Sequence, residues 1–232
     1  MKVSIRPIKI IKNYAPHAEG SCLFSMGNTQ VLCVASVETK RPPHAEQQNI
    51  GWVTAEYSML PRAGDKRTPR SRASSGGRSQ EISRLIGRAL RGVVDLEKLG
   101  ERAIIIDCDV IRADGGTRTA SINGGMIALA FALKKLYKEG AFSSWPLKDL
   151  IGAISVGVVN GKPMLDLDYI QDSQAESDCN FVMTSKGKFV EVQGTAEKNP
   201  FSEKELNQLI QLAKAGIRQV IEKQKNAIGK LF

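Results

Sequence analysis

Histidine is almost absent from this chain of 232 residues, which contains only His17 and His44. Neither lies in a Ser-His-Asp arrangement, and the chain has no P-loop, dinucleotide-binding fingerprint or zinc-ligand spacing. The four cysteines are scattered and include no Cys-x-x-Cys pair, so we expect buried, reduced thiols. Histidine-based nucleophilic catalysis and zinc chemistry are therefore not expected.

Negative charge and long apolar runs are also scarce. The chain has 33 Lys and Arg against 24 Asp and Glu, which gives a net charge of +9 and an isoelectric point near 9.4. Such an excess suits a nucleic acid or another polyanion as partner. No segment approaches the length of a membrane span, and the N-terminus lacks the apolar region of a signal peptide. We therefore expect a cytoplasmic protein without membrane contact.

Apolar residues make up 42% of the chain, which allows a sizeable core, and no long polar linker divides it. Three- and four-residue spacing of apolar side chains predicts helices over 78–94, from about 119 to 136, and after the capping box at 202–205. Apolar runs at 31–35, 103–111 and 151–159 predict strands, and Asn160-Gly161 predicts a hairpin. We expect residues 1–232 to form a single α+β domain.

The run Asp114-Gly115-Gly116-Thr117-Arg118 joins the strand at 103–111 to the long helix. Glycines allow a tight turn close to a ligand, and a helix start offers unpaired N–H groups and the positive end of its dipole. Thr117 and Arg118 add donors for phosphate oxygens, and Arg78 begins another helix from which it can reach the same anion. The pattern fits a phosphate pocket and fits equally an ordinary strand-to-helix turn with a solvated arginine, because Gly-Gly turns are common.

Residues 60–77 form a basic segment that has almost no apolar side chains. Such a segment cannot bury a core face, so we expect a mobile loop. An excess of cations favours contact with a nucleic-acid backbone, and the alternative is a solvated surface loop. The cations are Arg62, Lys66, Arg67, Arg70 and Arg72.

A cluster of carboxylates between residues 166 and 178 stands out in this basic chain. Asp172 and Asp178 are six residues apart, a spacing that a turn or short helix could fold toward a common point. Paired carboxylates suit a hard cation such as Mg²⁺, and one with a raised pKa can act as a general acid. An acidic loop paired with the basic surface is the alternative. Asp166 and Asp168 share one strand parity, and we expect them to serve structure and to tolerate replacement by Asn.

A phosphate pocket, a carboxylate pair and a basic loop together indicate phosphoryl transfer on a nucleic-acid chain. In such chemistry, positioning and electrostatic stabilisation supply most of the catalysis.

Several runs spread in order over almost the whole chain resemble the ribonuclease PH family of phosphorolytic exoribonucleases, which trim tRNA 3′ ends. They are Gly-Trp-Val-Thr-Ala-Glu-Tyr at 51–57, Met-Leu-Pro-Arg at 59–62, Arg-Leu-Ile-Gly-Arg-Ala-Leu-Arg at 84–91, Asp-Cys-Asp-Val at 107–110, the glycine turn at 113–121, Ile-Ser-Val-Gly at 154–157, Asp-Ser-x-Ala-Glu at 172–176 and Val-Gln-Gly-Thr-Ala-Glu at 192–197. The lead-in before Arg6 is several residues shorter than is usual in the family.

The resemblance implies a fold like the second domain of a small-subunit ribosomal protein, with βαβ-like units and mixed sheets packed against helices. It implies a homo-hexameric ring, a trimer of dimers. By the same resemblance, Arg78, Gly116, Thr117 and Arg118 bind inorganic phosphate as co-substrate, and Asp172 and Asp178 act at the scissile bond through Mg²⁺. The basic loop from Arg62 to Arg72 would hold tRNA.

Two alternatives stay open at this point. One is a catalytic ring subunit of an archaeal-type exosome, which would need an inactive partner subunit. The other is a non-catalytic RNA-binding ring subunit, which would have no need of the intact glycine turn and both aspartates.

Overall fold

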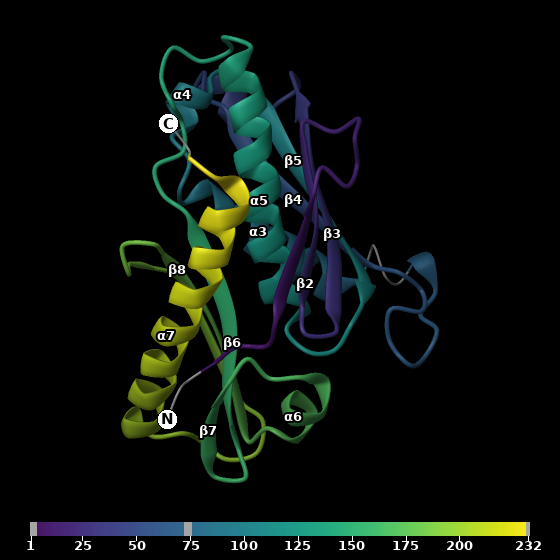
Figure 1. Ribbon diagram of the computed structural model, residues 1–232, viewed down its shortest axis with the longest axis vertical. Coiled ribbons are helices and arrows are strands. Elements are labelled where there is room, and N and C mark those ends of the chain that lie inside the picture. The colour runs from purple at the N-terminus through teal and green to yellow at the C-terminus, as the bar shows by residue number, and fades with distance from the viewer. Residues whose placement is uncertain (1–3, 72–75, 231–232) are drawn as a thin grey trace.

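The protein consists of two β-sheets with a long helix between them, seen here in a computed structural model that describes residues 4–71 and 76–230 (Figure 1). The first sheet has five strands in the order β1-β2-β3-β5-β4. Neighbouring strands are antiparallel from β1 to β5, and β4 runs parallel to β5. The strands are β1 (Ile8–Lys12), β2 (Gly20–Met26), β3 (Thr29–Glu38), β5 (Ala103–Arg112) and β4 (Trp52–Met59).

The parallel pair is joined by a helical crossover, as expected for a βαβ-like unit. Parallel strands cannot be connected by a tight hairpin, and the crossover runs through α3 (Gly77–Arg91) and α4 (Leu96–Leu99). The short helix α1 (Pro43–Gln47) lies in the polar stretch between β3 and β4.

The second sheet has four antiparallel strands in the order β7-β6-β8-β9. The strands are β6 (Ile151–Val159), β7 (Lys162–Leu165), β8 (Ser177–Thr184) and β9 (Phe189–Ala196). The hairpin predicted at Asn160-Gly161 joins β6 to β7, and both residues adopt positive φ there. The C-terminal helix α7 (Glu203–Ile228) begins with the predicted capping box and packs against β6, β7 and β8 (Figure 1).

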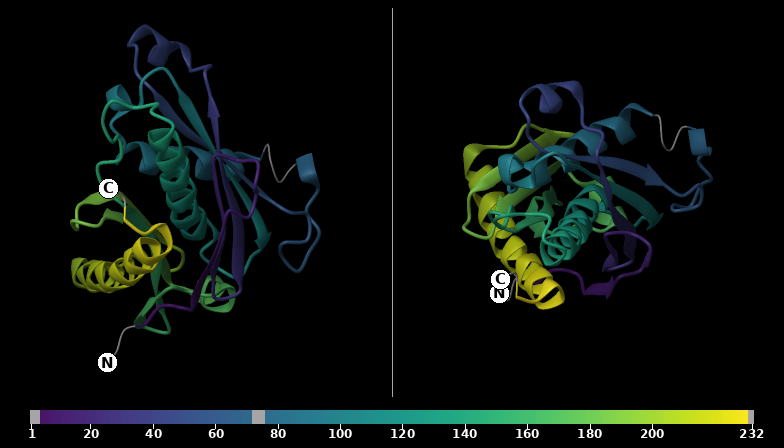
Figure 2. Two further views of the ribbon diagram at one scale, coloured as in Figure 1. Left: turned by 45° about the horizontal axis from the view of Figure 1, so that its top comes forward. Right: turned by 90° about the horizontal axis from the view of Figure 1, so that it is seen from above.

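Helix α5 (Thr117–Lys138) lies between the sheets and is buried on nearly every side over its first half (Figures 1 and 2). It packs on β2, β3 and β5 of the first sheet and on β6 and α7 on its other side. A Cβ atom on Gly124 would approach the Cys33 sulfur to 2.5 Å, so the helix can lie this close to the sheet only with glycine there. Asn123 bonds both backbone groups of Ala153 in β6, at 2.7 and 2.9 Å. Helix α5 thereby holds the two sheets in place relative to each other.

These observations confirm the predicted α+β fold with mixed sheets packed against helices. All four cysteines are buried and unpaired, as expected. One hydrophobic cluster includes residues of both sheets, and the prediction of a single domain stays a prediction. Within residues 4–71 and 76–230, no helix has the length and apolar character needed to cross a bilayer.

Candidate active site

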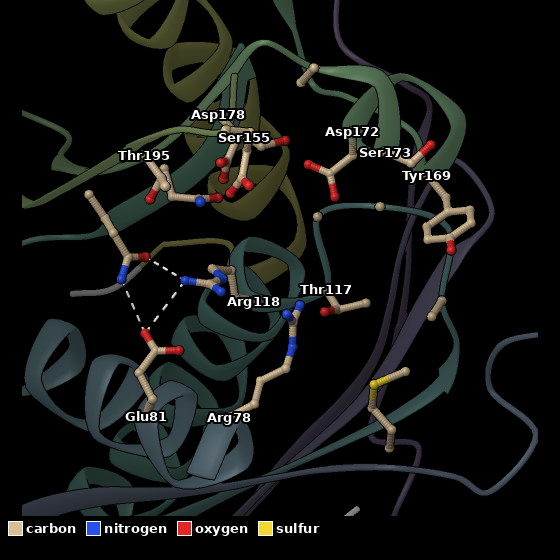
Figure 3. Close-up of a pocket in the computed structure, with 18 of the residues that line it drawn as sticks. Arg78, Glu81, Thr117, Arg118, Ser155, Tyr169, Asp172, Ser173, Asp178 and Thr195 are labelled. Atoms are coloured by element: carbon tan, nitrogen blue, oxygen red, sulfur yellow. Dashed lines mark hydrogen bonds and ion pairs between the residues drawn. The ribbon is translucent and has the colours of Figure 1, made fainter. Parts of the chain in front are cut away.

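A cavity of about 740 Å³ lies where the first turns of α3 and α5 face the second sheet (Figure 3). Arg78, Thr117 and Arg118 line it on the side of the two helix starts. Asp172 and Asp178 line the opposite side. The structure thus brings together the predicted phosphate-binding residues and the predicted carboxylate pair in one cavity.

The glycine turn begins α5 in the way that its sequence predicts. Gly115 and Gly116 have φ values of +73° and +63°, which glycine adopts without steric cost. The Thr29 hydroxyl holds the turn in place, since it donates to the Gly115 carbonyl at 2.6 Å and accepts from the Asp114 N–H at 2.9 Å. Thr117 is the first helical residue, so its backbone N–H belongs to the unpaired set at the helix start.

Gly115 also brings the glycine turn that precedes α5, here called the phosphate turn, against the backbone of Leu167 and Asp168. A Cβ atom at this position would lie 2.5 Å from the Leu167 carbonyl oxygen and 2.6 Å from the Asp168 carbonyl carbon. Only a residue without a side chain allows the two backbones to approach this closely. The distance between the arginines and the carboxylates therefore depends on this glycine.

Two residues that the sequence analysis does not single out hold the Arg118 guanidinium. Its Nη1 atom donates to the Gln193 amide oxygen in β9 and lies 3.5 Å from the Glu81 carboxylate in α3. The Gln193 amide nitrogen in turn donates to the same Glu81 oxygen at 3.1 Å (Figure 3). The three side chains form a closed network that leaves the remaining Arg118 donors for a ligand.

The two aspartates come from different elements. Asp172 lies in the short helix α6 (Tyr169–Gln174), and Asp178 lies in strand β8. Only Asp172 lies in the short helix that the spacing suggested, and Asp178 lies outside it because pairing with β6 and β9 extends β8 back to Ser177. The six-residue spacing nevertheless folds both carboxylates toward the cavity (Figure 3).

The environment of the cavity raises the pKa of both carboxyl groups. For Asp172, partial burial raises the pKa, and the guanidinium groups of Arg78 and Arg118 oppose the rise. For Asp178, burial again raises the pKa, and the charges of Asp172 and then Glu197 raise it further. A carboxyl group whose pKa is raised by burial and by a neighbouring carboxylate favours binding of a cation or retention of a proton.

Opposite charges face one another across the cavity without pairing. In the part of the chain that the structure describes, no ion pair joins Arg78 or Arg118 to Asp172 or Asp178. Ser155 in β6 also lines the cavity, and its hydroxyl is buried without a hydrogen-bond partner in the described structure. A polar ligand between the two sides would satisfy these groups.

Asp166 and Asp168 have structural roles, as the sequence analysis expects. Asp168 caps α6 in a capping box with Gln171. Asp166 is buried and forms an ion pair with Arg6 at 2.6 Å. The ion pair predicts that Asp166→Asn costs stability, because removal of the charge leaves Arg6 without this counter-ion. The tolerance of Asp168 for Asn stays a prediction.

The described part of the basic segment, residues 60–71, follows β4 and extends away from the body of the protein (Figure 2). Its base is anchored, since Ala63 is buried and its carbonyl accepts from the Ala113 N–H at 2.8 Å. Arg62, Lys66, Arg67 and Arg70 are exposed, and none of them lines the cavity. Arg72 lies outside the described residues. The assignment of this segment to RNA binding stays a prediction.

The cavity offers the two carboxylates of Asp172 and Asp178 to a metal ion. Within residues 4–71 and 76–230, no group of three His, Cys, Asp or Glu side chains is arranged to hold a metal. Mg²⁺ commonly binds through one or two carboxylates and completes its shell with water and substrate phosphates. Asp172 and Asp178 fit that donor set.

The chain belongs to the 3′ exoribonuclease family. The model for domain 1 of this family matches residues 4–134, and the model for domain 2 matches residues 149–216. The cavity draws its arginines from the first matched region and its aspartates from the second.

Curated relatives give a finer resemblance. The chain is 55% identical to proteins named ribonuclease PH from Neisseria meningitidis serogroup C and from Neisseria gonorrhoeae. Each match extends over 228 residues and includes 97% of this chain and 94% of the relative.

Solved structures resemble the chain in fold. Rice Rrp46 has a TM-score of 0.79 at 19% identity, with 99% of this chain and 98% of that one covered. A subunit of the Archaeoglobus fulgidus exosome with RNA bound to the active site has a TM-score of 0.80 at 22% identity, with 95% and 89% covered.

Proposed function

We propose that this protein is a phosphate-dependent 3′-to-5′ exoribonuclease that trims the 3′ ends of tRNA precursors. The observation that carries the proposal is the cavity, in which two arginines and a helix start face two carboxylates of raised pKa without touching them. Identity of 55% over 97% of the chain to proteins named ribonuclease PH supports the same reaction.

The reaction is a phosphorolysis. An oxygen of inorganic phosphate attacks the phosphorus of the terminal 3′,5′-phosphodiester, and the bond from that phosphorus to the 3′ oxygen of the preceding nucleotide breaks. A nucleoside 5′-diphosphate leaves, and the shortened RNA keeps a 3′ hydroxyl. Arg78, Thr117 and Arg118 would hold the attacking phosphate with charge-assisted donors and the start of α5.

Asp178 would provide the proton for the leaving 3′ oxygen, because burial and the charge of Asp172 favour its protonated form. Asp172 would hold a Mg²⁺ ion, and Asp178 would join it as a ligand only in its ionised form. When bound, the ion supplies positive charge to the phosphodiester. At the edge of the cavity, Tyr169 exposes 59% of its surface and offers a ring on which an RNA base can stack.

A phosphorolysis assay tests the reaction class. A tRNA with a 3′ extension is incubated with and without inorganic phosphate, and the released nucleotides are separated. We expect nucleoside diphosphates only when phosphate is present. Nucleoside monophosphates released without phosphate would identify a hydrolase and refute the proposal.

The proposed assembly is a homo-hexamer, a trimer of dimers, in the cytoplasm. The basic segment and the net charge of +9 suit tRNA as the polymer that it binds. The archaeal-type exosome subunit differs in needing a second kind of chain. Size-exclusion chromatography of the purified chain separates the two, since a hexamer formed by this chain alone excludes an obligate hetero-ring.

A further inference from the structure

Tyr57 lies behind the phosphate turn and connects to both helices that carry the arginines. It belongs to β4, and only 3% of its surface is exposed. Its hydroxyl bonds the Thr117 hydroxyl at 2.9 Å, at the start of α5. Its backbone N–H donates to the Ser83 hydroxyl of α3 at 2.9 Å. Tyr57 therefore links the sheet to the start of α5 through its side chain and to α3 through its backbone.

The direction of the Tyr57–Thr117 hydrogen bond follows from counting protons. Burial raises the pKa of the Tyr57 phenol, so the group is protonated at neutral pH. Its proton needs an acceptor, and in the described structure the Thr117 oxygen is the partner within reach. Tyr57 is therefore the donor, and Thr117 accepts.

This arrangement determines what Thr117 can offer to a ligand. A threonine hydroxyl has one proton and can accept bonds through its oxygen. With one acceptor position taken by Tyr57, the Thr117 proton is free to point into the cavity that this residue lines. The same residue offers the unpaired N–H of the helix start.

We propose that Tyr57 is a positioning residue that fixes the Thr117 hydroxyl as a hydrogen-bond donor to the attacking phosphate. The inference rests on the proposed function, because it concerns the phosphate of that reaction. The site so arranged selects a tetrahedral oxyanion that presents an unprotonated oxygen to Thr117. Without the Tyr57 hydroxyl, the Thr117 hydroxyl can rotate, and the fixed donor is lost.

Replacement of Tyr57 by Phe tests the proposal, since it keeps the ring and removes only the hydroxyl. We expect the apparent KM for phosphate to rise about three- to tenfold, the effect of one hydrogen bond. The kcat at saturating phosphate and the KM for RNA should stay within about twofold of the wild-type values. Tyr137→Phe, which alters a tyrosine packed against Trp145, serves as the matched control with an unchanged KM for phosphate.

A double-mutant cycle distinguishes positioning from general packing. If Tyr57 acts through Thr117, then Tyr57→Phe should raise the KM for phosphate in the wild type and have no further effect in a Thr117→Val background. Effects that multiply in the double variant would overturn the inference. An unchanged KM for phosphate in Tyr57→Phe would overturn it as well.

A measurement without RNA separates this inference from the proposed reaction. The rise in Tm that inorganic phosphate causes reports phosphate binding directly. We expect Tyr57→Phe to need about three- to tenfold more phosphate for the same rise. A wild-type enzyme that degrades RNA without phosphate would refute the proposed reaction, whereas a phosphate-dependent enzyme with an unaltered response in Tyr57→Phe would refute the inference alone.

Discussion

Arg6 and Asp166, which are 160 residues apart in sequence, form an ion pair of 2.6 Å beside the phosphate turn. The Arg6 guanidinium also donates to the Asp114 carbonyl at 2.6 Å, and the Arg6 backbone N–H donates to the Asp166 carboxylate at 2.7 Å. Arg6 therefore joins the N-terminal segment, the turn that begins α5 and the segment that leads to Asp172.

Replacement of Asp166 by Asn is expected to destabilise the protein by about 2–3 kcal/mol, because it leaves Arg6 without a counter-ion. The Asp166 side chain is 2% exposed and that of Arg6 is 17% exposed, so solvent compensates the loss only in part. Asp168→Asn is the matched control, since Asn caps a helix about as well as Asp. Urea unfolding measures both, and equal stability of the two variants would contradict this role of the ion pair.

Replacement of Arg78 by Ala should raise the apparent KM for phosphate tenfold or more. It removes a charge-assisted donor from the cavity, an effect of about 1.5–3 kcal/mol. Arg118→Ala should also raise the KM for phosphate, and it would remove the Arg118 contacts with Gln193 and Glu81. RNA affinity in a filter-binding assay should change little.

Arg88→Ala is the control on the same helix, because Arg88 pairs with Glu191 at 2.9 Å and does not line the cavity. If the Arg78 variant lost RNA binding but kept a normal dependence on phosphate, the phosphate pocket would be assigned wrongly.

Local sequence predicted the parts of the site that depend on neighbouring residues. The Gly115-Gly116 turn, the helix start at Thr117 and the capping box of α7 all follow from short-range rules. The α+β class followed from the alternation of helical and strand spacing.

The remaining contacts join residues that are distant in sequence. Glu81 and Gln193 are 112 residues apart, and Tyr57 and Thr117 are 60 apart. Spacing along the chain carries no signal for such pairs, because sheet order and helix packing decide which side chains meet. Two of these residues lie in the runs 51–57 and 192–197 that resemble the family, which was the one available indication of their importance.

The next prediction concerns the basic segment and the binding of tRNA. Neutralisation of Arg67, Arg70 and Arg72 together should weaken tRNA binding and reduce its salt dependence by about two units of slope, at about 0.7–0.9 per lost phosphate contact. Turnover of a short single-stranded RNA should fall less, because such a substrate need not reach this segment. Equal losses on both substrates would place these arginines at the reaction itself.

Asp107 predicts how stability depends on pH away from the cavity. Burial raises its pKa first, and the charges of Glu56, Asp109 and Glu38 raise it further. A raised pKa in the folded state means that ionised Asp107 opposes folding above that pKa. Asp107→Asn should therefore have a higher Tm than the wild type at pH 7. The difference should shrink as pH falls through the folded pKa toward the unfolded value of about 3.9. A Tm difference that persists unchanged in acid would contradict this cause.

Asp178→Asn is the most demanding test of the proposed chemistry. The change keeps the size of the side chain and removes both the charge that a cation needs and the proton that the leaving 3′ oxygen would accept. We expect kcat to fall at least a hundredfold, since general acid–base roles contribute about 10²–10⁴ in rate. Folding, assembly and tRNA affinity should be preserved, because Asp178 makes no ion pair in the described structure.

Asp168→Asn is again the control and should stay active, because its structural role as a helix cap is one that Asn can fill. Single-turnover kinetics at saturating phosphate separates the chemical step from binding. If Asp178→Asn were active and Asp168→Asn inactive, the catalytic carboxylate would be Asp168 at the start of α6 and not Asp178 in β8. Because Asp168 accepts from the Gln171 N–H at 2.9 Å, its carboxylate is already engaged, and we expect the strand residue to carry the reaction.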